Sequence, residues 1–324
     1  MRYVMMSIRD CCVLTLILLM SPVTGPSHAE EVTPRCEMWV DAYLGESVGY
    51  KQVLDDLAGV RVVYIGERHR LDRHHEIQEK IIDDLAQKGM RLVLGLEQME
   101  ALQQPMLDRY SQGEIDFQQL AEVTEWAKRW GNYQDYRAIL ETAREHGIPI
   151  LALNARSEVV RQVARGGGVD KLSPEMRKQL PTDLRLEDPV YGKLLDWQLM
   201  VHMTATTERL RPIREAQICR DEMMADVLTQ YLRSKKGKGR TAIVLAGVGH
   251  VSFGLGTVSR VKRRIPGIKD RVLLLSESGD LELTAAEKAM ARPIEITHEQ
   301  LKSLGRPLAD YFHIRSAKSR GPKE

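Results

Sequence analysis

Short hydrophobic runs that end in polar residues constrain the fold of this 324-residue chain more than any other feature. Four of them are Arg61–Ile65, Arg91–Leu96, Ile148–Leu153 and Thr241–Ala246, and Arg271–Ser276 looks like a fifth. Runs of this length that are bounded by turn residues favour strands buried on both faces, as in a parallel sheet. We therefore predict an α/β fold whose mostly parallel central sheet is flanked by helices.

Helical sequence separates the predicted strands. Asp72 begins an amphipathic pattern that runs to about Lys88 and would join the first two strands as a βαβ crossover. Longer helical insertions are predicted over 101–146 and between Asn154 and the run at 241–246, the second ending in a helix over 213–233. The fold class is thus α/β with large helical insertions.

The amino terminus has the pattern of a secretory signal. Arg2 and Arg9 precede the apolar run Cys11–Met20, and Ser27-His28-Ala29 offers small residues at the cleavage positions. We predict a signal peptide over 1–29 and a periplasmic or secreted mature chain with no stable membrane span, because the apolar run is too short to cross a bilayer. The mature chain divides into an N-terminal segment (30–59), an α/β domain (60–314) and a disordered tail (315–324).

Net charge and cysteine content constrain the function less than the strand pattern does. The formal net charge of +2 gives no reason to expect a nucleic acid. Removal of the signal would leave two cysteines, Cys36 and Cys219, in a compartment that permits disulfides. A disulfide between them and two free thiols are both open.

Polar residues follow four of the predicted strands, and these are the candidates for chemistry. They are Glu67, His69, Glu97, Asn154 and His250. In an open α/β sheet, ligands bind beyond the carboxyl ends of the strands, so these side chains are expected at one edge. Two histidines with one or two carboxylates suit a divalent metal with open positions, with His69, Glu97 and His250 as ligands and Glu67 as a further acid. Purely structural roles remain the alternative, and Asn154 either closes a turn or contacts a ligand.

Aromatic residues at near-helical spacing follow the second strand. The group is Trp126, Trp130, Tyr133 and Tyr136. Haem sites use such side chains for packing and a tyrosine, histidine or cysteine to bind iron. A stripe of this kind is nevertheless more typical of an ordinary core than of a cofactor wall.

Several strings together resemble the ChaN-like haem-binding uptake proteins of the Tiki superfamily. The resemblance runs in order from about Val60 to Arg264 and weakly on to Tyr311. The strings are Tyr64-Ile-Gly-Glu-Arg-His69 with His74, His75 and Gln78; Gly95-Leu-Glu-Gln98 with Gln104; Trp130 with Tyr133 and Tyr136; Ile150-Leu-Ala-Leu-Asn154; Glu215-Ala-Gln217 with Asp221, Met224 and Ala225; and Ala246-Gly-Val-Gly-His250.

The resemblance implies a fold shared with Tiki proteases, TraB-like proteins and erythromycin esterases. For a ChaN-like protein it implies a homodimer that holds haem near its interface through tyrosine and works with other iron-uptake components. That tyrosine role can be carried over only to Tyr133, Tyr136 or Tyr191 as candidates. For a Tiki-like protein it implies metal-dependent cleavage by Glu67, His69, Glu97 and His250.

Two functions are therefore expected in order of preference. The first is an exported haem-binding protein of haem or iron uptake, with haem as the cofactor. The second is a metal-dependent hydrolase, a peptidase or esterase, in which a divalent ion lowers the pKa of bound water and a glutamate transfers protons.

Overall fold

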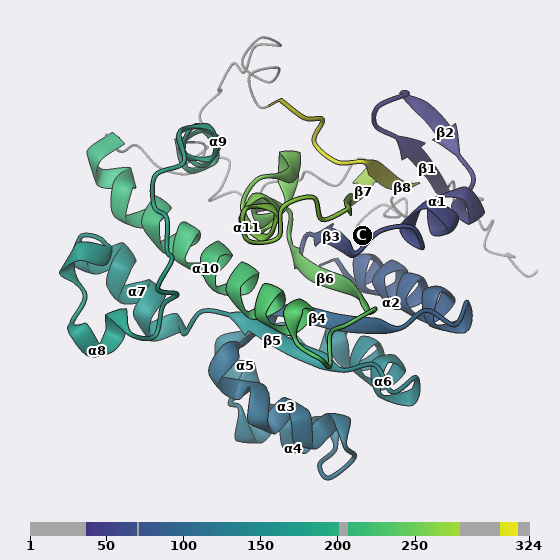
Figure 1. Ribbon diagram of the computed structural model, residues 1–324, viewed down its shortest axis with the longest axis horizontal. Coiled ribbons are helices and arrows are strands. Elements are labelled where there is room, and N and C mark those ends of the chain that lie inside the picture. Colours follow the sequence, from purple (N-terminus) through teal and green to yellow (C-terminus); the bar gives the residue numbers. More distant parts are fainter. Residues whose placement is uncertain (1–36, 70, 201–206, 279–304, 317–324) are drawn as a thin grey trace, which may run out of the picture. The chain divides into compact units, whose positions relative to one another are not determined.

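The computed structural model describes residues 37–69, 71–200, 207–278 and 305–316. Within these ranges eight strands form a single sheet in the order β2-β1-β8-β7-β3-β6-β4-β5, with helices packed on it (Figure 1). The predicted α/β fold with a mostly parallel sheet is confirmed. The strands are β1 (Glu37–Asp41), β2 (Glu46–Val48), β3 (Val62–Glu67), β4 (Leu92–Glu100), β5 (Ile150–Asn154), β6 (Thr241–Gly247), β7 (Asp270–Ser278) and β8 (Tyr311–Ser316).

The helices fall between the strands much as expected. They are α1 (Tyr50–Leu57), α2 (Asp72–Gln87), α3 (Gln104–Ser111), α4 (Phe117–Val123), α5 (Trp126–Arg129), α6 (Arg137–Glu145), α7 (Ser157–Gly166), α8 (Pro174–Arg177), α9 (Pro189–Met200), α10 (Thr207–Arg233) and α11 (Thr257–Arg264). Short 3₁₀ turns include η1 (Ala101–Gln103), η2 (Tyr133–Tyr136), η3 (Val169–Lys171), η4 (Val248–His250) and η5 (Ser252–Gly254). The stretch 101–146 is not one helix but a series of short ones. Gly113 and Glu125 adopt left-handed backbone angles there, which interrupt a helix.

The five predicted strands lie side by side in the sheet and run parallel to one another. They are β3, β4, β5, β6 and β7, paired in the order β7-β3-β6-β4-β5. Helix α2 carries the chain from β3 to β4, and β6 occupies the place between those two strands. The antiparallel pairs lie at the other side of the sheet, where β1 pairs with both β2 and β8.

Both faces of the parallel strands are buried, which explains why they appear as continuous hydrophobic runs. Along β3, Val63 and Ile65 pack with α1 to α6 on one face, whereas Val62 and Tyr64 pack with α10 and α11 on the other. Figure 1 shows these two helical layers on opposite sides of the strands. Side chains alternate along a strand, so each hydrophobic run serves two cores.

Two segments outside the predicted α/β domain contribute to the sheet. The segment 30–59 supplies β1, β2 and α1, none of which the sequence predicted. The predicted disordered tail was wrong to begin at Arg315, because this residue belongs to β8, is 7% exposed and pairs with Glu37 at 3.0 Å. These strands are short and their apolar stretches span three residues or fewer, so pairing rather than local composition forms them.

Some expectations lie beyond or at the limit of the described residues. The predicted signal peptide and Cys36 are outside them. Cys219 is a buried free thiol in the described part of the chain, and burial raises its pKa to about 12. None of the helices in the described ranges has the length and apolarity needed to span a membrane.

Candidate functional site

The predicted site residues meet at the carboxyl edge of the parallel strands. Glu67 ends β3, Asn154 ends β5, and His250 lies in the turn η4 that follows β6. Glu97 lies inside β4 rather than after it, at a point where the pairing between β4 and β5 changes register. The prediction placed the end of this strand at Leu96, too early, because a local irregularity lets it continue to Glu100.

Glu67 is a buried carboxylate that accepts several hydrogen bonds. His69 Nδ1 lies 2.7 Å from its Oε1, Gln98 Nε2 donates to the same oxygen at 3.0 Å, and Gln78 and Tyr136 also donate to the carboxylate. Burial alone would raise the pKa of Glu67, but the hydrogen bond and charge of His69 outweigh it, so the pKa is lowered. Glu67 therefore remains ionised and fixes the orientation of His69.

His69 is the member of the cluster whose ring reaches solvent. Its side chain is 34% exposed, and the ring meets Trp130 edge to face at 4.7 Å. Burial opposes its charge, but the hydrogen bond to Glu67 and the nearby carboxylate of Glu97 raise its pKa. A Cβ on Gly247 would lie 2.7 Å from His69 Nε2, so the glycine leaves room for this ring.

His250 is held between two carboxylates. Its Nδ1 lies 2.7 Å from Asp221 Oδ1 and its Nε2 lies 3.1 Å from Glu97 Oε1. A carboxylate only accepts, so both ring nitrogens donate and the ring is an imidazolium. Burial opposes this charge, but Glu97 and Asp221 raise the pKa of His250 to about 10. Burial alone would raise the pKa of Glu97. The charge of His250 outweighs this effect and lowers the pKa of Glu97 to about 2.

Asp221 is a site residue that the sequence analysis names only within the family resemblance and not as a candidate for chemistry. It lies in α10, is fully buried, and also accepts hydrogen bonds from Tyr191 at 2.8 Å and Thr257 at 2.9 Å. A carboxylate within a 27-residue helix is an unremarkable pattern. The one available signal is its spacing of four from Gln217, which places both residues on the helix face that contacts His250.

The structure does not support the predicted metal centre of His69, Glu97 and His250. Over the described ranges, no three or more histidine, cysteine, aspartate or glutamate side chains are grouped to hold a metal ion. These side chains pair with one another instead, because both nitrogens of His250 and Nδ1 of His69 are directed at carboxylate oxygens.

The three candidate tyrosines have different surroundings. Tyr136 and Tyr191 are fully buried and donate to Glu67 and Asp221, and burial next to these carboxylates raises the pKa of both phenols. Tyr133 is partly buried; its ring stacks on Phe117, and its hydroxyl accepts a hydrogen bond from Gln134 at 2.6 Å.

Asn154 connects two strands. Its Nδ2 donates to the carbonyl of Glu97 at 2.8 Å, and its Oδ1 accepts from Ala155 N at 2.9 Å and from Arg220 at 3.2 Å. The amide group thus closes the turn after β5, which is the structural alternative that the sequence left open. Asn154 also lines the cavity beside the site.

A cavity of about 470 Å³ adjoins this cluster, between the ends of β4 and β5, the segment around α5, and helices α7 and α10. Glu97 and Asn154 form part of its wall, together with apolar surface from Trp130, Val160 and Ala164. The remaining wall is strongly cationic and includes Lys128, Arg129, Arg161, Arg165 and Arg220. We call it the cationic cavity.

Comparisons with known proteins place the chain in a family. It is 25% identical over 249 residues to Protein RETICULATA-RELATED 5, chloroplastic, of Arabidopsis thaliana, covering 69% of this chain and 32% of that protein, so it spans about a third of that relative. A solved structure described as cofacial haem binding to ChaN of Campylobacter jejuni shares its fold with a TM-score of 0.63 and 20% identity, covering 87% of this chain and 97% of that one. An erythromycin esterase, EreC, aligns with a TM-score of 0.43 and 13% identity over 74% of this chain and 77% of its own. The family model for haem-binding uptake proteins (Tiki superfamily, ChaN) matches residues 53–261, which include β3 to β6 and most of α11. As the resemblance implied, the chain belongs to this ChaN family of haem-binding uptake proteins.

Proposed function

We propose that this protein binds haem and serves haem or iron uptake after export to the periplasm or the exterior. The family match over residues 53–261 carries the proposal, because it includes the elements that form the site and the cationic cavity. The signal-like pattern of basic, apolar and small residues over 1–29 supports export. A homodimer around the haem remains part of the proposal.

The cationic cavity has the volume of an ordinary ligand pocket and offers apolar and cationic side chains to haem. Ligand pockets commonly enclose about 300–1,000 Å³, and this one has about 470 Å³. A macrocycle needs apolar surface for its ring, which Trp130, Val160 and Ala164 offer. Bound haem would supply iron chemistry, while the side chains of this chain hold and orient the macrocycle.

Tyr133 is the tyrosine we propose as the iron ligand. Iron binds a phenolate, and Tyr136 and Tyr191 resist ionisation because each is buried beside a carboxylate that accepts its proton in a hydrogen bond. The hydroxyl of Tyr133 contacts only a side-chain amide in the described structure. Tyr133 follows Trp130, which lines the cavity, by three residues, while its own ring packs on Phe117 and Trp126 outside the cavity wall.

A haemin titration of the purified mature chain tests the proposal. We expect a saturable shift of the Soret band in the wild type and an altered iron spectrum in Tyr133→Phe. Tyr231→Phe, which removes a half-buried phenol near the amino ends of the strands, should behave like the wild type. No saturable shift in folded wild type would refute haem binding, and an unchanged spectrum in Tyr133→Phe would refute only the ligand.

A second candidate function rests on His69. A histidine that is one-third exposed, held by Glu67 and raised in pKa is arranged to donate a proton to a leaving group, as hydrolysis requires. We propose hydrolysis of an ester or peptide as the alternative activity of the same edge of the sheet.

Turnover of an unactivated alkyl ester, whose alkoxide must take up a proton as it leaves, separates this alternative from haem binding. We expect an active wild type and an inactive His69→Gln, with His146→Gln as a control because His146 pairs with Asp83 on the surface. Equal rates in His69→Gln and the wild type would exclude His69 as the proton donor.

A further inference from the structure

We propose that the cationic cavity holds the carboxylate groups of the ligand, which for haem are its two propionates. This inference rests on the proposed function and adds to it the part of the protein that recognises the charged edge of haem. Three guanidinium groups carry it: Arg161 and Arg165 from α7, and Arg220 from α10.

These three arginines have no carboxylate partner within the part of the chain that the structure describes. Arg220 donates to the amide oxygen of Asn154 at 3.2 Å, which leaves its charge uncompensated. Arg161 and Arg165 are exposed and Arg220 is half-buried, whereas Arg263 and Arg264 both lie 2.7 Å from Glu222. The unpaired guanidinium groups around the cavity are thus available to an anionic ligand.

The other charges in the wall are already engaged. Arg129 pairs with Glu100 at 2.8 Å, and Lys128 pairs with Glu125. Of the two carboxylates in the wall, Glu97 is balanced by His250, and one oxygen of Glu100 accepts from Arg129 and Ser157. Positive charge therefore exceeds negative charge in the cavity.

A buried donor at the same place lacks a partner. Arg129 Nε is buried and has no hydrogen-bond acceptor among the described residues. A buried polar group without a partner costs free energy, so this N–H adds to the uncompensated positive charge in the wall. Gln98 Oε1 and Glu100 Oε2, from two other residues of the wall, are also buried and have no hydrogen-bond partner among the described residues.

The spacing of the arginines matches a ligand with two carboxylates on one edge. Arg161 and Arg165 are one helical turn apart, so both extend from the same face of α7. Each planar guanidinium can bind one carboxylate through two parallel hydrogen bonds. Val160 and Ala164, also from α7, and Trp130 supply apolar surface in the same cavity, which suits the flat body of the ligand.

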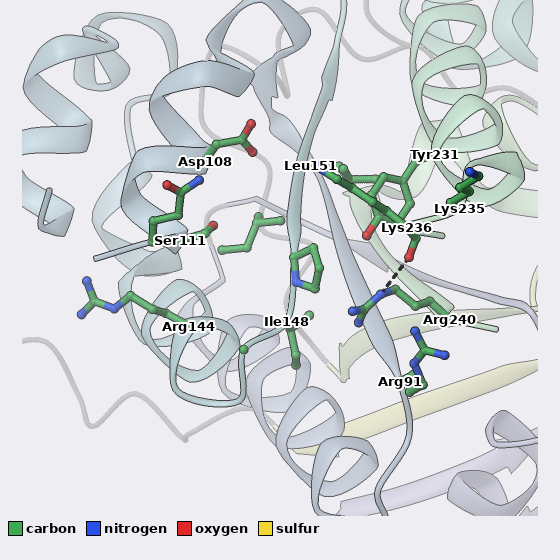
Figure 2. Close-up of a pocket in the computed structure, with 14 residues that line it drawn as sticks. Arg91, Asp108, Ser111, Arg144, Ile148, Leu151, Tyr231, Lys235, Lys236 and Arg240 are labelled. Carbon is green, nitrogen blue, oxygen red and sulfur yellow. Dashed lines mark hydrogen bonds between the residues drawn. The ribbon is translucent and has the colours of Figure 1, made fainter. Parts of the chain in front are cut away.

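A second basic cavity provides a matched control. It has about 410 Å³ and lies at the amino ends of the strands, where Arg91 precedes β4 and Arg240 precedes β6 (Figure 2). Arg240 donates to the backbone carbonyls of Leu92 at 2.8 Å and Lys236 at 3.1 Å. The exposed cations of this cavity can be removed without touching the cationic cavity.

The experiment compares haem with its dimethyl ester, which lacks both carboxylate charges. Dissociation constants are measured from the Soret band for the wild type, for R161Q/R165Q/R220Q, and for the control R91Q/K235Q/K236Q, which removes the same number of charges. We expect the first variant to bind haem at least tenfold more weakly than the wild type and the control. With the dimethyl ester, all three proteins should bind alike. The double variant R161Q/R165Q, whose residues are exposed, serves if Arg220 is required for folding.

The outcomes separate the two proposals. Tight haem binding that is equal in the wild type and in R161Q/R165Q/R220Q would overturn the inference and leave haem binding standing. Binding of neither haem nor its ester by the wild type would refute the proposed function. Thermal unfolding with glutarate, a small molecule with two carboxylates, then tests the cavity without haem. Stabilisation of the wild type but not of R161Q/R165Q/R220Q supports an anion site. No stabilisation of the wild type overturns it.

Discussion

The charge of His250 organises the carboxylates of the site. Its imidazolium is buried between Asp221 and Glu97, and Asp221 accepts two further hydrogen bonds from Tyr191 and Thr257. Removing one partner of a buried ion pair leaves a charge without compensation, which typically costs about 3–5 kcal/mol. The carboxylates, rather than a metal, define the position of this ring in the described structure.

The stability of the protein should therefore depend on pH through His250. Because its folded pKa is about 10, against 6.5 when unperturbed, its contribution is fully present below pH 6.5 and is lost as the pH rises towards 10. We expect the free energy of unfolding of the wild type to fall across this window by a few kcal/mol, on the order that such a shift implies. Urea unfolding of His250→Gln should lack this fall, whereas His146→Gln should follow the wild type. Parallel profiles for His250→Gln and the wild type would contradict the prediction.

Gly247 controls the position of the His69 ring. In Gly247→Ala the new Cβ would meet His69 Nε2 at 2.7 Å, while the backbone angles at this position suit any residue. We expect the ring to move away from Glu67 and its pKa to fall, as measured by NMR titration of the imidazole, with little change in stability. Gly249→Ala is the control, because its Cβ would approach side chains only to 3.8 Å. An unchanged pKa of His69 in Gly247→Ala would show that this glycine has no such role.

At the scale of elements, α10 links the site to the core. The same helix presents Asp221 to His250 and Arg220 to the cationic cavity, and Leu228 packs two turns further along against the strands. Damage to the packing of this helix should therefore reach the site as well as the fold.

Leu228→Ala tests the packing of α10. Leu228 is fully buried, so its truncation should cost about 2–5 kcal/mol in the free energy of unfolding. Gln230→Ala, on the exposed face of the same helix, should change stability by less than about 0.5 kcal/mol. Denaturant unfolding measures both, and similar losses in the two variants would show that the burial of Leu228 does not set the stability here.

The elements that the sequence predicted are those that bury both faces. The strands β3 to β7 are visible as hydrophobic runs, and Glu67, Asn154 and His250 follow from their ends. Two features of the site could not be predicted from the sequence, because no local pattern encodes them. The irregular pairing of β4 keeps Glu97 inside the strand, and the charge on His250 depends on Asp221, which is distant in sequence. Breaks within 101–146 escaped too, because apolar periodicity continues across a left-handed turn.

At the scale of the whole described molecule, the sheet joins the two ends of the described chain. Strand β8 lies between β7, with which it runs parallel, and β1, with which it runs antiparallel. Trp39 pairs with His313 across this boundary, and their rings lie 4.8 Å apart. Sequence patterns could not reveal this pairing, because each strand is short and the partners are separated by almost the entire described chain.

Ile314→Pro should disconnect the first hairpin from the sheet. Ile314 pairs with Met38 on one side and Ser276 on the other, and proline removes a backbone donor from a strand that is paired on both sides. We expect a lower thermal midpoint and rapid proteolysis within β1 and β2, while Ile314→Val keeps the wild-type behaviour. Resistance of the hairpin to protease in Ile314→Pro would show that α1 alone holds it.

The central position of β8 also sets an order of assembly during synthesis. A ribosome delivers β1 early, yet the strand that pairs it with the rest of the sheet emerges only near the end of the described chain. Until then β1 and β7 each present an unpaired edge, and such edges invite association with other chains. We therefore expect chaperones to retain nascent chains that stop before Tyr311. Once β8 is made, it pairs with both edges, and the chain no longer needs the chaperone.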